Sequence, residues 1–297
     1  MTVPGASGAV VTGAGRGLGR ALAGMLADRG YAVHVTDVDL AAAKAAAAEI
    51  GHDGFASALD VRDAQACLDI AHATSERVGS LGLWVNNAGV LVTGPAWEQD
   101  ENTRRLMMEV NGLGAMNGTL AALDVMRGQS SGHVVTIVSR AGLVAVPGEA
   151  VYAASKHAAI GFALSTLADL RLAGITHIDI SCVCPDGIWT PMLYDKLDDP
   201  QAALSFSGKL LEPEDVVKAV AKVLDKPKPV TTVPAWRGGQ VRVIDALPRV
   251  RSRRPDSSTR TPVARSESSG GAMPRRAASS DHCSLTSPNV IAGVAKP

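Results

Sequence analysis

Short apolar runs alternate with longer stretches of helical spacing along most of the chain. The apolar runs, many of them β-branched, lie at residues 9–12, 32–36, 83–85, 133–138, 178–183 and 230–233. Stretches with the apolar spacing of helices lie at residues 20–29, 40–50, 64–78 and 216–224. Strands that alternate with helices indicate βαβ units and a parallel sheet. Because the predicted strands are apolar throughout, we expect helices on both faces of a doubly wound α/β sheet.

The composition of the 297-residue chain changes near residue 250. From residue 251 onward, ten serines and several prolines stand among few large apolar residues. Such a segment cannot bury enough apolar surface to offset the entropy lost on ordering. We therefore predict a single folded domain over residues 1–248 and a basic, disordered tail over residues 249–297.

The 29 basic and 29 acidic residues cancel over the whole chain but are unevenly distributed. From residue 249 on, eight Arg and one Lys stand against three acidic residues, a net charge of +6, so the first 248 residues carry −6. Aromatic residues make up 3% of the chain, and none lies among the arginines of the tail. We therefore expect no nucleic-acid partner, and a basic arm for nucleic acid or an acidic partner is the alternative for the tail.

The four cysteines form no Cys-x-x-Cys unit, so the sequence predicts no metal site. No basic segment followed by an apolar stretch opens the chain, which argues against a signal peptide. No uncharged apolar run reaches about 18 residues, so we expect no membrane span and no membrane partner. A cytoplasmic location with reduced thiols is the expectation that follows.

A glycine-rich turn at residues 12–19, with the sequence TGAGRGLG, follows the first predicted strand and opens a helix. Glycines at these positions let the backbone turn tightly and approach a pyrophosphate without a Cβ clash. The helix beyond them offers free N–H groups and the positive end of its dipole. The turn therefore predicts a dinucleotide site in a Rossmann-type sheet.

Asp37 follows the second predicted strand, 18 residues after Gly19. A carboxylate there can accept hydrogen bonds from both hydroxyls of an adenosine ribose and would repel a 2′-phosphate. This position predicts NAD in preference to NADP. Arg16 and Arg62 leave NADP open, because an arginine near the ribose could accept the phosphate.

Tyr152 and Lys156 are four residues apart, so on a helix their side chains share one face. An ammonium beside a phenol favours the phenolate and should lower the pKa of the tyrosine from its ordinary value near 10. Such a tyrosine can act as a general acid or base near neutral pH. Ser139 ends a strong strand run thirteen residues earlier, and its hydroxyl could hold a substrate oxygen beside the phenol.

With these motifs the sequence resembles the short-chain dehydrogenase/reductase family, in its single-domain form. The resemblance covers about residues 5–248, and its pieces follow the order and spacing of the family: residues 12–19, Asp37, Asp60-Val61, Asn86-Asn87-Ala88-Gly89, Asn111, Ser139, the Tyr152-Ala153-Ala154-Ser155-Lys156 run, and Pro185 to Thr190. It implies an NAD(P)-dependent enzyme that transfers a hydride between a nicotinamide cofactor and an alcohol or ketone.

The resemblance also implies a role for each matching residue. Tyr152 would be the general acid or base, Lys156 would lower its pKa and hold the nicotinamide ribose, and Ser139 would orient the substrate oxygen. Asn111 would anchor a water in a proton relay to Lys156. The implied cofactor contacts, with Tyr152 and Lys156, are Gly13, Gly15, Arg16, Gly17, Leu18, Gly19, Asp37, Asp60, Val61, Asn87, Ala88, Gly89, Pro185, Gly187, Ile188 and Thr190.

One departure from the family pattern lies in the segment expected to meet the nicotinamide. Asp186 stands between Pro185 and Gly187, which are usually adjacent in the family. The contacts of this segment with the nicotinamide therefore stay open.

The residues that follow Ser139 and Thr190, or lie just before Thr190, are the candidates for the substrate site: Ala141, Val146, Trp189, Met192 and Leu193. An apolar set of this kind suits an apolar alcohol or ketone, and packing against the cofactor and nearby helices is the alternative. Residues 186–212 form the predicted substrate loop. The Ala-rich helix that carries Lys156 resembles the pairing helix of the family, which implies a homodimer or homotetramer.

Two other functions use the same residues. An NADPH-dependent ketone reductase would need the same proton-transfer group with the other cofactor. A non-catalytic protein that senses NAD(H) would need no such group, so the presence of Ser139, Tyr152 and Lys156 argues against it.

Overall fold

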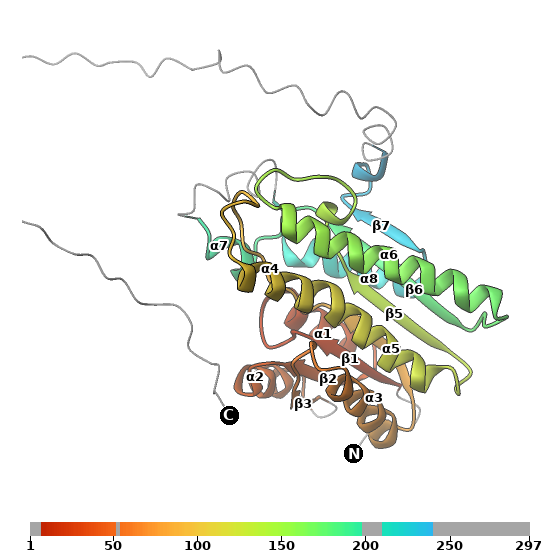
Figure 1. Ribbon diagram of the computed structural model, residues 1–297. Coiled ribbons are helices and arrows are strands. Elements are labelled where there is room, and N and C mark those ends of the chain that lie inside the picture. The colour runs from red at the N-terminus through yellow and green to blue at the C-terminus, as the bar shows by residue number, and fades with distance from the viewer. Residues whose placement is uncertain (1–6, 52–53, 198–209, 240–297) are drawn as a thin grey trace, which may run out of the picture. The chain divides into compact units, whose positions relative to one another are not determined.

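The computed structural model describes residues 7–51, 54–197 and 210–239 of the chain (Figure 1). Its centre is a seven-stranded sheet in the order β3-β2-β1-β4-β5-β6-β7, and every neighbouring pair is parallel. The strands are β1 (Gly8–Thr12), β2 (Ala32–Asp37), β3 (Phe55–Ala58), β4 (Leu81–Asn86), β5 (Gly132–Ile137), β6 (Ile178–Pro185) and β7 (Val230–Val233). The predicted doubly wound α/β fold is confirmed, and six of these strands lie where the apolar runs predict them.

The edge strand β3 is missing from the sequence prediction. Its sequence, Phe-Ala-Ser-Ala, contains one large apolar residue and no β-branched residue. Its side chains are half-buried or exposed, because β3 has a neighbour on one side alone. A strand of this kind needs little apolar surface, so it leaves little pattern in the sequence.

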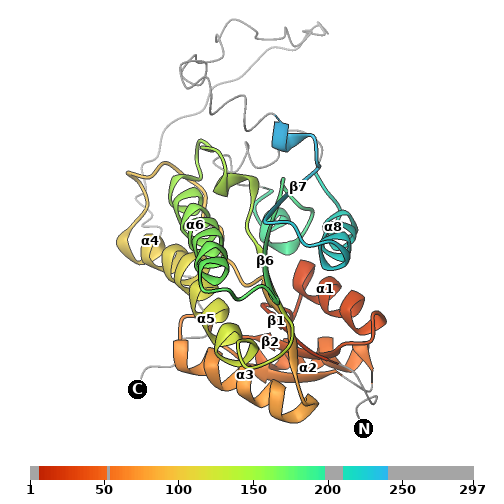
Figure 2. The same cartoon turned by 90° about the vertical axis from the view of Figure 1, so that its right-hand side faces the viewer.

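Helices cover both faces of the sheet (Figure 2). One face carries α1 (Gly17–Asp28), α2 (Leu40–Ile50) and α8 (Pro213–Asp225). The other carries α3 (Ala64–Val78), α5 (Gly114–Met126) and α6 (Ala150–Leu172). The shorter elements are α4 (Glu101–Met107), a π-helix at Met108–Leu113, a 3-10 turn at Arg140–Gly142 and α7 (Pro191–Tyr194).

Local signals in the sequence fix where several helices begin. Asp39 caps α2 by accepting from the backbone N–H groups of Ala41 and Ala42, and Asp63 caps α3 in the same way through Ala66. Pro213 occupies the first turn of α8, a position that its fixed φ and missing N–H favour. The caps of α2 and α3 place the starts of these helices shortly after β2 and β3, at the carboxyl edge of the sheet.

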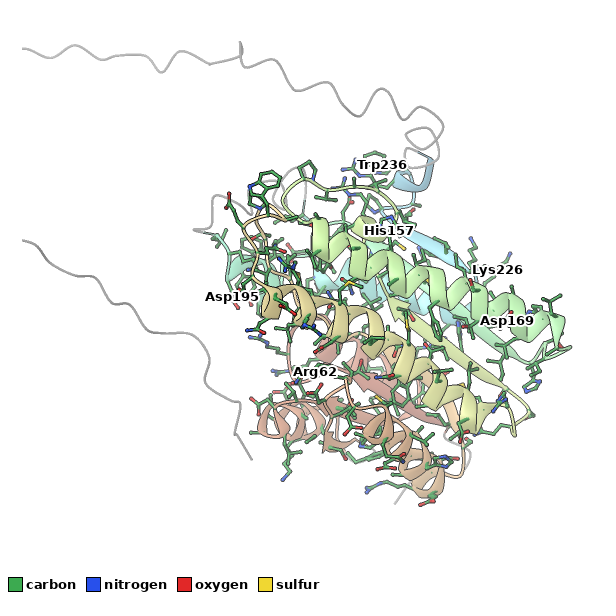
Figure 3. All side chains as sticks on the ribbon, in the orientation of Figure 1. Arg62, His157, Asp169, Asp195, Lys226 and Trp236 are labelled. Atoms are coloured by element: carbon green, nitrogen blue, oxygen red, sulfur yellow. The ribbon has the colours of Figure 1, made fainter. Side chains whose placement is uncertain are left out.

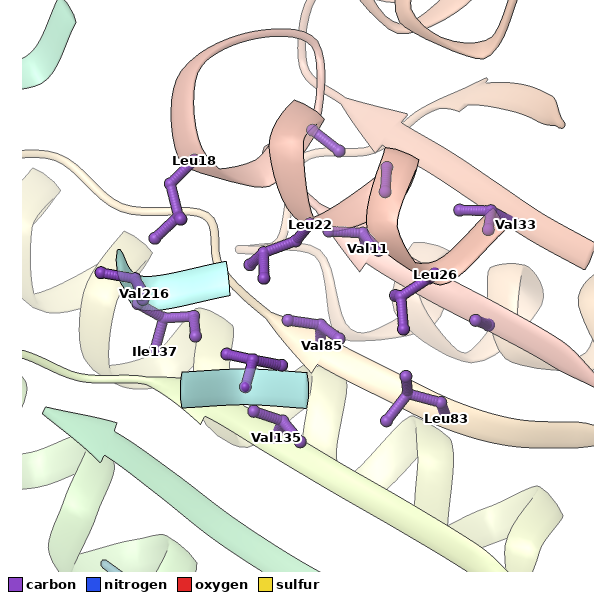
Figure 4. Close-up of a cluster of buried hydrophobic side chains, with 14 of the residues drawn as sticks. Val11, Leu18, Leu22, Leu26, Val33, Leu83, Val85, Val135, Ile137 and Val216 are labelled. Carbon is purple, nitrogen blue, oxygen red and sulfur yellow. The ribbon is translucent and has the colours of Figure 1, made fainter. Parts of the chain in front are cut away.

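A cluster of apolar side chains joins the sheet to one helical layer (Figure 4). Val11, Val85 and Val135 come from adjacent strands, and Leu22 of α1 and Val216 of α8 pack against them. All five side chains are fully buried. Removing several methylene groups from such a site costs about 2–5 kcal/mol, so this packing holds the central strands and their carboxyl ends rigidly.

Contacts divide the chain into two units, Met1–Ser252 and Arg253–Pro297, and every described residue belongs to the first. The predicted tail at 249–297 lies outside the described residues, so the domain boundary at 248 stays a prediction. Within the described part of the chain, no helix is long and apolar enough to cross a membrane.

Candidate active site

Several positions of the glycine-rich turn between β1 and α1 require glycine. Gly13 and Gly17 have φ angles of 61° and 56°, which favour glycine. A Cβ on Gly19 would lie 2.3 Å from the carbonyl oxygen of Gly13 and 2.5 Å from Nδ2 of Asn87. The turn therefore presents bare backbone at the start of α1, which fits the pyrophosphate of a dinucleotide.

The segment after β4 is tied to this turn by hydrogen bonds. Asn87 Nδ2 donates to the carbonyl oxygens of Thr12 and Gly13 at 2.9 and 3.0 Å. The backbone N–H groups of Asn87 and Ala88 both donate to Thr12 Oγ1 at 3.0 Å. These contacts bring predicted cofactor residues from two distant parts of the sequence to one edge.

Asp37 is held at the glycine turn by the backbone. Its Oδ2 accepts from the N–H of Gly15 at 2.9 Å, and its Oδ1 accepts from the N–H of Asp39 at 3.1 Å. The carboxylate therefore stands beside the middle of the turn, at the end of β2.

Arg62, which could serve a phosphate, is already bound to an acid. Its Nε lies 2.9 Å from each carboxylate oxygen of Asp60, and its Nη1 lies 3.8 Å from Glu109 (Figure 3). The hydrogen bond from Arg62 lowers the pKa of Asp60, so this carboxylate stays ionised at neutral pH. Val61 is buried next to it, and its carbonyl accepts from Asn117 at 2.9 Å.

Ser139, Tyr152 and Lys156 come together at the end of β5. Ser139 precedes the 3-10 turn, and its Oγ accepts from the N–H of Ala141 at 3.1 Å. The Ser139 hydroxyl is near enough to the phenol of Tyr152 to lower the pKa of that phenol. On α6, the Lys156 Nζ lies 5.7 Å from the centre of the Tyr152 ring and donates to the carbonyl of Ile137 at 3.1 Å. Tyr152 and Lys156 are 8% and 5% exposed, so both act in a nearly dry environment.

The predicted fall in the pKa of Tyr152 is wrong for this arrangement. Burial raises the pKa of Tyr152 above its ordinary value, Glu149 raises it further, and the hydroxyl of Ser139 opposes the rise. Burial also lowers the pKa of Lys156 to about 8. Sequence spacing showed that the two groups share a helix face but not how deeply both are buried, and desolvation is the largest cause of the rise.

Asn111 lies in the π-helical segment between α4 and α5, where the regular spacing of the helix is interrupted. Its Oδ1 accepts from the N–H of Val90 at 2.8 Å, and its Nδ2 donates to the carbonyl of Val90 at 2.9 Å and to Ser155 Oγ at 3.0 Å. The sequence analysis did not predict this π-helical segment.

Ser155 also belongs to this site, although the sequence analysis assigned it no role. It is fully buried, and its Oγ donates to the carbonyl of Tyr152 at 2.7 Å while accepting from Asn111. Its place directly before Lys156 was the available signal. Gly89 completes the arrangement, since a Cβ there would lie 3.2 Å from Asn111 Oδ1 and 3.5 Å from Lys156 Nζ.

The segment after β6 runs toward the glycine turn. The carbonyl of Gly187 accepts from Leu211, and Ile188 pairs with Leu211 in an isolated bridge. Thr190 precedes α7, and a Cβ on Gly17 would lie 3.8 Å from its Cβ. Pro185, Gly187, Ile188 and Thr190 thus lie on the edge that carries the glycine turn.

The predicted substrate residues fall into two groups. Ala141 is buried against Tyr152 and Met107, with Val146 packed on the same cluster. Trp189, Met192 and Leu193 lie on or next to α7, where Trp189 contacts the ring of Tyr194 at a centroid distance of 5.6 Å. Of the predicted substrate loop, residues 198–209 lie outside the described residues.

Chemically, this edge of the sheet combines the exposed backbone of the glycine turn, the carboxylate of Asp37 and a buried phenol with a hydroxyl and an ammonium nearby. Among the residues described, no group of three His, Cys, Asp or Glu side chains could hold a metal ion. The arrangement suits proton transfer to or from a substrate oxygen next to a bound dinucleotide.

Comparison with known proteins places the chain in the short-chain dehydrogenase family. A family model described as short chain dehydrogenase matches residues 7–201. SadH of Mycobacterium tuberculosis, an oxidoreductase by name, is 31% identical over 252 residues, which cover 82% of this chain and 90% of that protein. Estradiol 17-beta-dehydrogenase 11 of Mus musculus is 31% identical over 229 residues, covering 76% and 74%.

A solved structure is similar over the same region. It is a short chain dehydrogenase/reductase from Burkholderia phymatum in complex with NAD, with a TM-score of 0.74 and 28% sequence identity. The match covers 82% of this chain and 95% of that one.

Proposed function

Because this chain belongs to the short-chain dehydrogenase family, we propose that it is an NAD-dependent enzyme in which Tyr152 exchanges the hydroxyl proton of an alcohol or ketone. The observation that carries this proposal is the buried side chain of Tyr152, which lies beside the hydroxyl of Ser139 and has its ring centre 5.7 Å from the ammonium of Lys156. A group with this geometry can act as a general acid or base.

The bound nicotinamide supplies the acceptor or donor of the hydride. The chain's own residues handle the proton and the substrate oxygen. Ser139 Oγ and the phenol of Tyr152 hold the substrate oxygen between them, so the proton moves along a hydrogen bond already formed. For ketone reduction, Tyr152 donates the proton, and its raised pKa keeps it protonated at neutral pH. For alcohol oxidation, Tyr152 must first lose its proton.

Lys156 and Asn111 support this exchange. The ammonium of Lys156 would hold the nicotinamide ribose, and its charge would stabilise a phenolate. The Asn111 side chain is bound to Val90 and Ser155, which fixes the π-turn beside Lys156. We assign Asn111 to the proton relay that connects Lys156 with solvent.

NAD is favoured over NADP by the two carboxylates at the adenosine end. Asp37 stands beside the glycine turn, where a 2′-phosphate would meet its negative charge. Arg62, the neighbouring cation, is engaged by Asp60. Arg16 has an exposed side chain at the start of α1 and is the residue through which NADPH could still bind.

An apolar substrate suits the residues around the phenol. Ala141, Val146 and Met107 surround Tyr152 on one side. Trp189, Met192 and Tyr194 are each more than a third exposed, which leaves aromatic and apolar surface available to a substrate. A secondary alcohol or ketone with a large apolar body fits this chemistry.

The outer face of α6 is the proposed pairing surface, with a second copy of the chain as its partner. Ala154, His157 and Gly161 are exposed and line a groove of about 810 Å³. Leu113 and Leu120, on the preceding helical segment, are 51% and 55% exposed. Light scattering should give a dimer or tetramer, and Ala154→Arg should dissociate it whereas Ala41→Arg on α2 should not.

A cytoplasmic location is part of the same proposal. The described cysteines, Cys67, Cys182 and Cys184, are buried free thiols, which a reducing compartment preserves.

A substrate panel with a matched pair of variants tests the proposed function. Purified protein is assayed with NAD and a series of secondary alcohols, and with NADH and the corresponding ketones. Tyr152→Phe should lower the rate by about 10²–10⁴-fold and leave NADH binding within a few-fold. Tyr31→Phe, the same change at the opposite edge of the sheet, should leave both unchanged. Retained activity in Tyr152→Phe would exclude the assigned role, and a preference for NADPH would select the reductase alternative.

A further inference from the structure

The neighbouring strands β5, β6 and β7 end at the catalytic edge, and the hydrogen bonds between them stop just before Ser139 and residues 187–190. The last bond between β5 and β6 joins the N–H of Val138 to the carbonyl of Val183 at 2.8 Å. The last bond between β6 and β7 joins the N–H of Asp186 to the carbonyl of Val233 at 2.9 Å. Ser139 and residues 187–190 lie beyond these bonds, so the sheet alone does not fix their mutual position.

Asp186 bridges two arginines across this gap. Its Oδ2 accepts from Arg237 Nε at 2.7 Å, and its Oδ1 lies 2.9 Å from Arg140 Nε. The Arg140 contact is an ion pair outside hydrogen-bond alignment, whereas the Arg237 contact is a hydrogen bond. The side chain of Asp186 is 10% exposed, and those of Arg140 and Arg237 are 28% and 23% exposed.

Each arginine is attached to a different strand end. Arg140 follows Ser139 directly and begins the 3-10 turn whose Ala141 N–H donates to Ser139 Oγ. Arg237 lies on the turn after β7, where its guanidinium stacks on Trp236 at 4.3 Å (Figure 3). Asp186 itself begins the segment that leads to Gly187 and Thr190.

We propose that Asp186 is a positioning residue for the reaction, which sets the place of Ser139 relative to the nicotinamide-binding segment through its ion pair with Arg140. This inference rests on the proposed function. The carboxylate occupies the position that interrupts the usual Pro-Gly pair of the family, so the departure has a physical role in this chain.

The carboxylate of Asp186 keeps two guanidinium groups close together. With the carboxylate in place, two largely buried guanidinium groups are held at its two oxygens. Without it, both cations would face each other in a poorly hydrated space and would separate. Separation would move the turn that carries Ser139, and misplacement of a reacting group by about 1 Å can lower a rate by about 10²-fold.

The test compares Asp186→Asn with Asp179→Asn, because Asp179 lies near the start of β6 and Asp186 directly follows the end of that strand. Asp179 is paired with Arg171 at 2.9 Å at the opposite end of β6, so it is a matched ion pair away from the site. Alcohol oxidation with NAD is measured with protiated and C-deuterated substrate, and amide hydrogen exchange is followed at residues 139–143 and 187–190.

Asp186→Asn should lower kcat by about 10–100-fold with KM changed less than about threefold, and the deuterium isotope effect on kcat should increase. Exchange should accelerate in both segments, and Asp179→Asn should change none of these. A kcat within threefold of wild type would overturn the proposal. So would a lower kcat with an unchanged isotope effect, because that result indicates loss of folded protein alone.

Arg140→Gln keeps the proposal testable if Asp186→Asn does not fold. It leaves the pair between Asp186 and Arg237 intact and should reproduce the loss of kcat and the larger isotope effect. Unchanged kinetics in this variant would also overturn the proposal. The amide exchange measurement distinguishes failure of this proposal from failure of the proposed function. If wild type showed no activity but Asp186→Asn still exchanged faster in both segments, the proposed function would be refuted and the structural role of the Asp186 ion pair would stand.

Discussion

We predict that replacing Asp37 with Asn reverses the proposed preference for NAD over NADP. The change removes the negative charge and keeps the size of the side chain. Asp37 is held by the N–H groups of Gly15 and Asp39 at 2.9 and 3.1 Å, and an Asn oxygen can keep one of these bonds. The position of residue 37 should therefore survive the substitution.

The expected change in cofactor preference has two parts, one for each cofactor. Hydrogen bonds to a charged group contribute about 1.5–3 kcal/mol, so losing the charge should raise the Kd for NADH by about 10- to 150-fold. Two like charges 4 Å apart repel by about 4 kcal/mol at an effective dielectric constant near 20 and about 1 kcal/mol in water. Asp37 is half-buried, so removing about 2 kcal/mol of repulsion should lower the Kd for NADPH by about 30-fold.

Isothermal titration with NADH and NADPH measures both constants, and Asp39→Asn is the control. Asp39 carries the same charge two residues away, but its carboxylate caps α2, and Asn caps nearly as well. Its Kd values should stay within about threefold of wild type. If both variants shifted the preference equally, the local contact would be irrelevant. If Asp37→Asn kept the wild-type ratio, the assignment of Asp37 to the ribose would be refuted.

Three further predictions follow from packing and protonation. Gly19→Ala should abolish tight NADH binding, because its Cβ would lie 2.3 Å from a carbonyl oxygen, whereas Gly24→Ala in the same helix meets nothing within 4 Å and should stabilise the fold by about 0.5–1 kcal/mol in thermal unfolding. Burial lowers the pKa of His34 to about 4 from 6.5, so its contribution of about 3 kcal/mol is complete above pH 6.5 and is lost as the pH falls toward 4. The free energy of unfolding by urea should differ less between pH 7 and pH 5 for His34→Gln than for wild type, and an equal difference would contradict this. Because burial raises the pKa of Tyr152, kcat/KM for alcohol oxidation should rise with pH above neutrality while that for ketone reduction stays flat, and equal profiles would contradict this.

The parts of the fold that bury apolar surface could be predicted from the sequence. The runs that became β1, β2 and β4 to β7 are apolar and flanked by turns, and α2 and α3 match their predicted bounds because Asp39 and Asp63 cap them. β3 could not be predicted, since an edge strand with the sequence Phe-Ala-Ser-Ala needs little apolar surface.

The sequence could predict which residues form the candidate site, but not how deeply they are buried or which charged groups surround them. Motif order identified Ser139, Tyr152 and Lys156, which the fold brings together. The direction of the Tyr152 pKa depends on burial by residues distant in sequence, so helix spacing could not give it. Asp186 pairs with Arg140 and Arg237, which lie up to 51 residues from it in the sequence. No local sequence pattern predicts these pairs.

Transfer of an isotope from substrate to cofactor tests the central claim most directly. Purified protein is incubated with NAD and a secondary alcohol deuterated at the carbinol carbon, and the deuterium content of the NADH formed is measured by mass spectrometry. Wild type should place one deuterium on the nicotinamide, and Tyr152→Phe should bind NADH normally but transfer about 10²–10⁴-fold more slowly. Binding of NADH without any transfer by wild type, over a broad range of alcohols, would contradict the catalytic assignment and favour a protein that senses the cofactor.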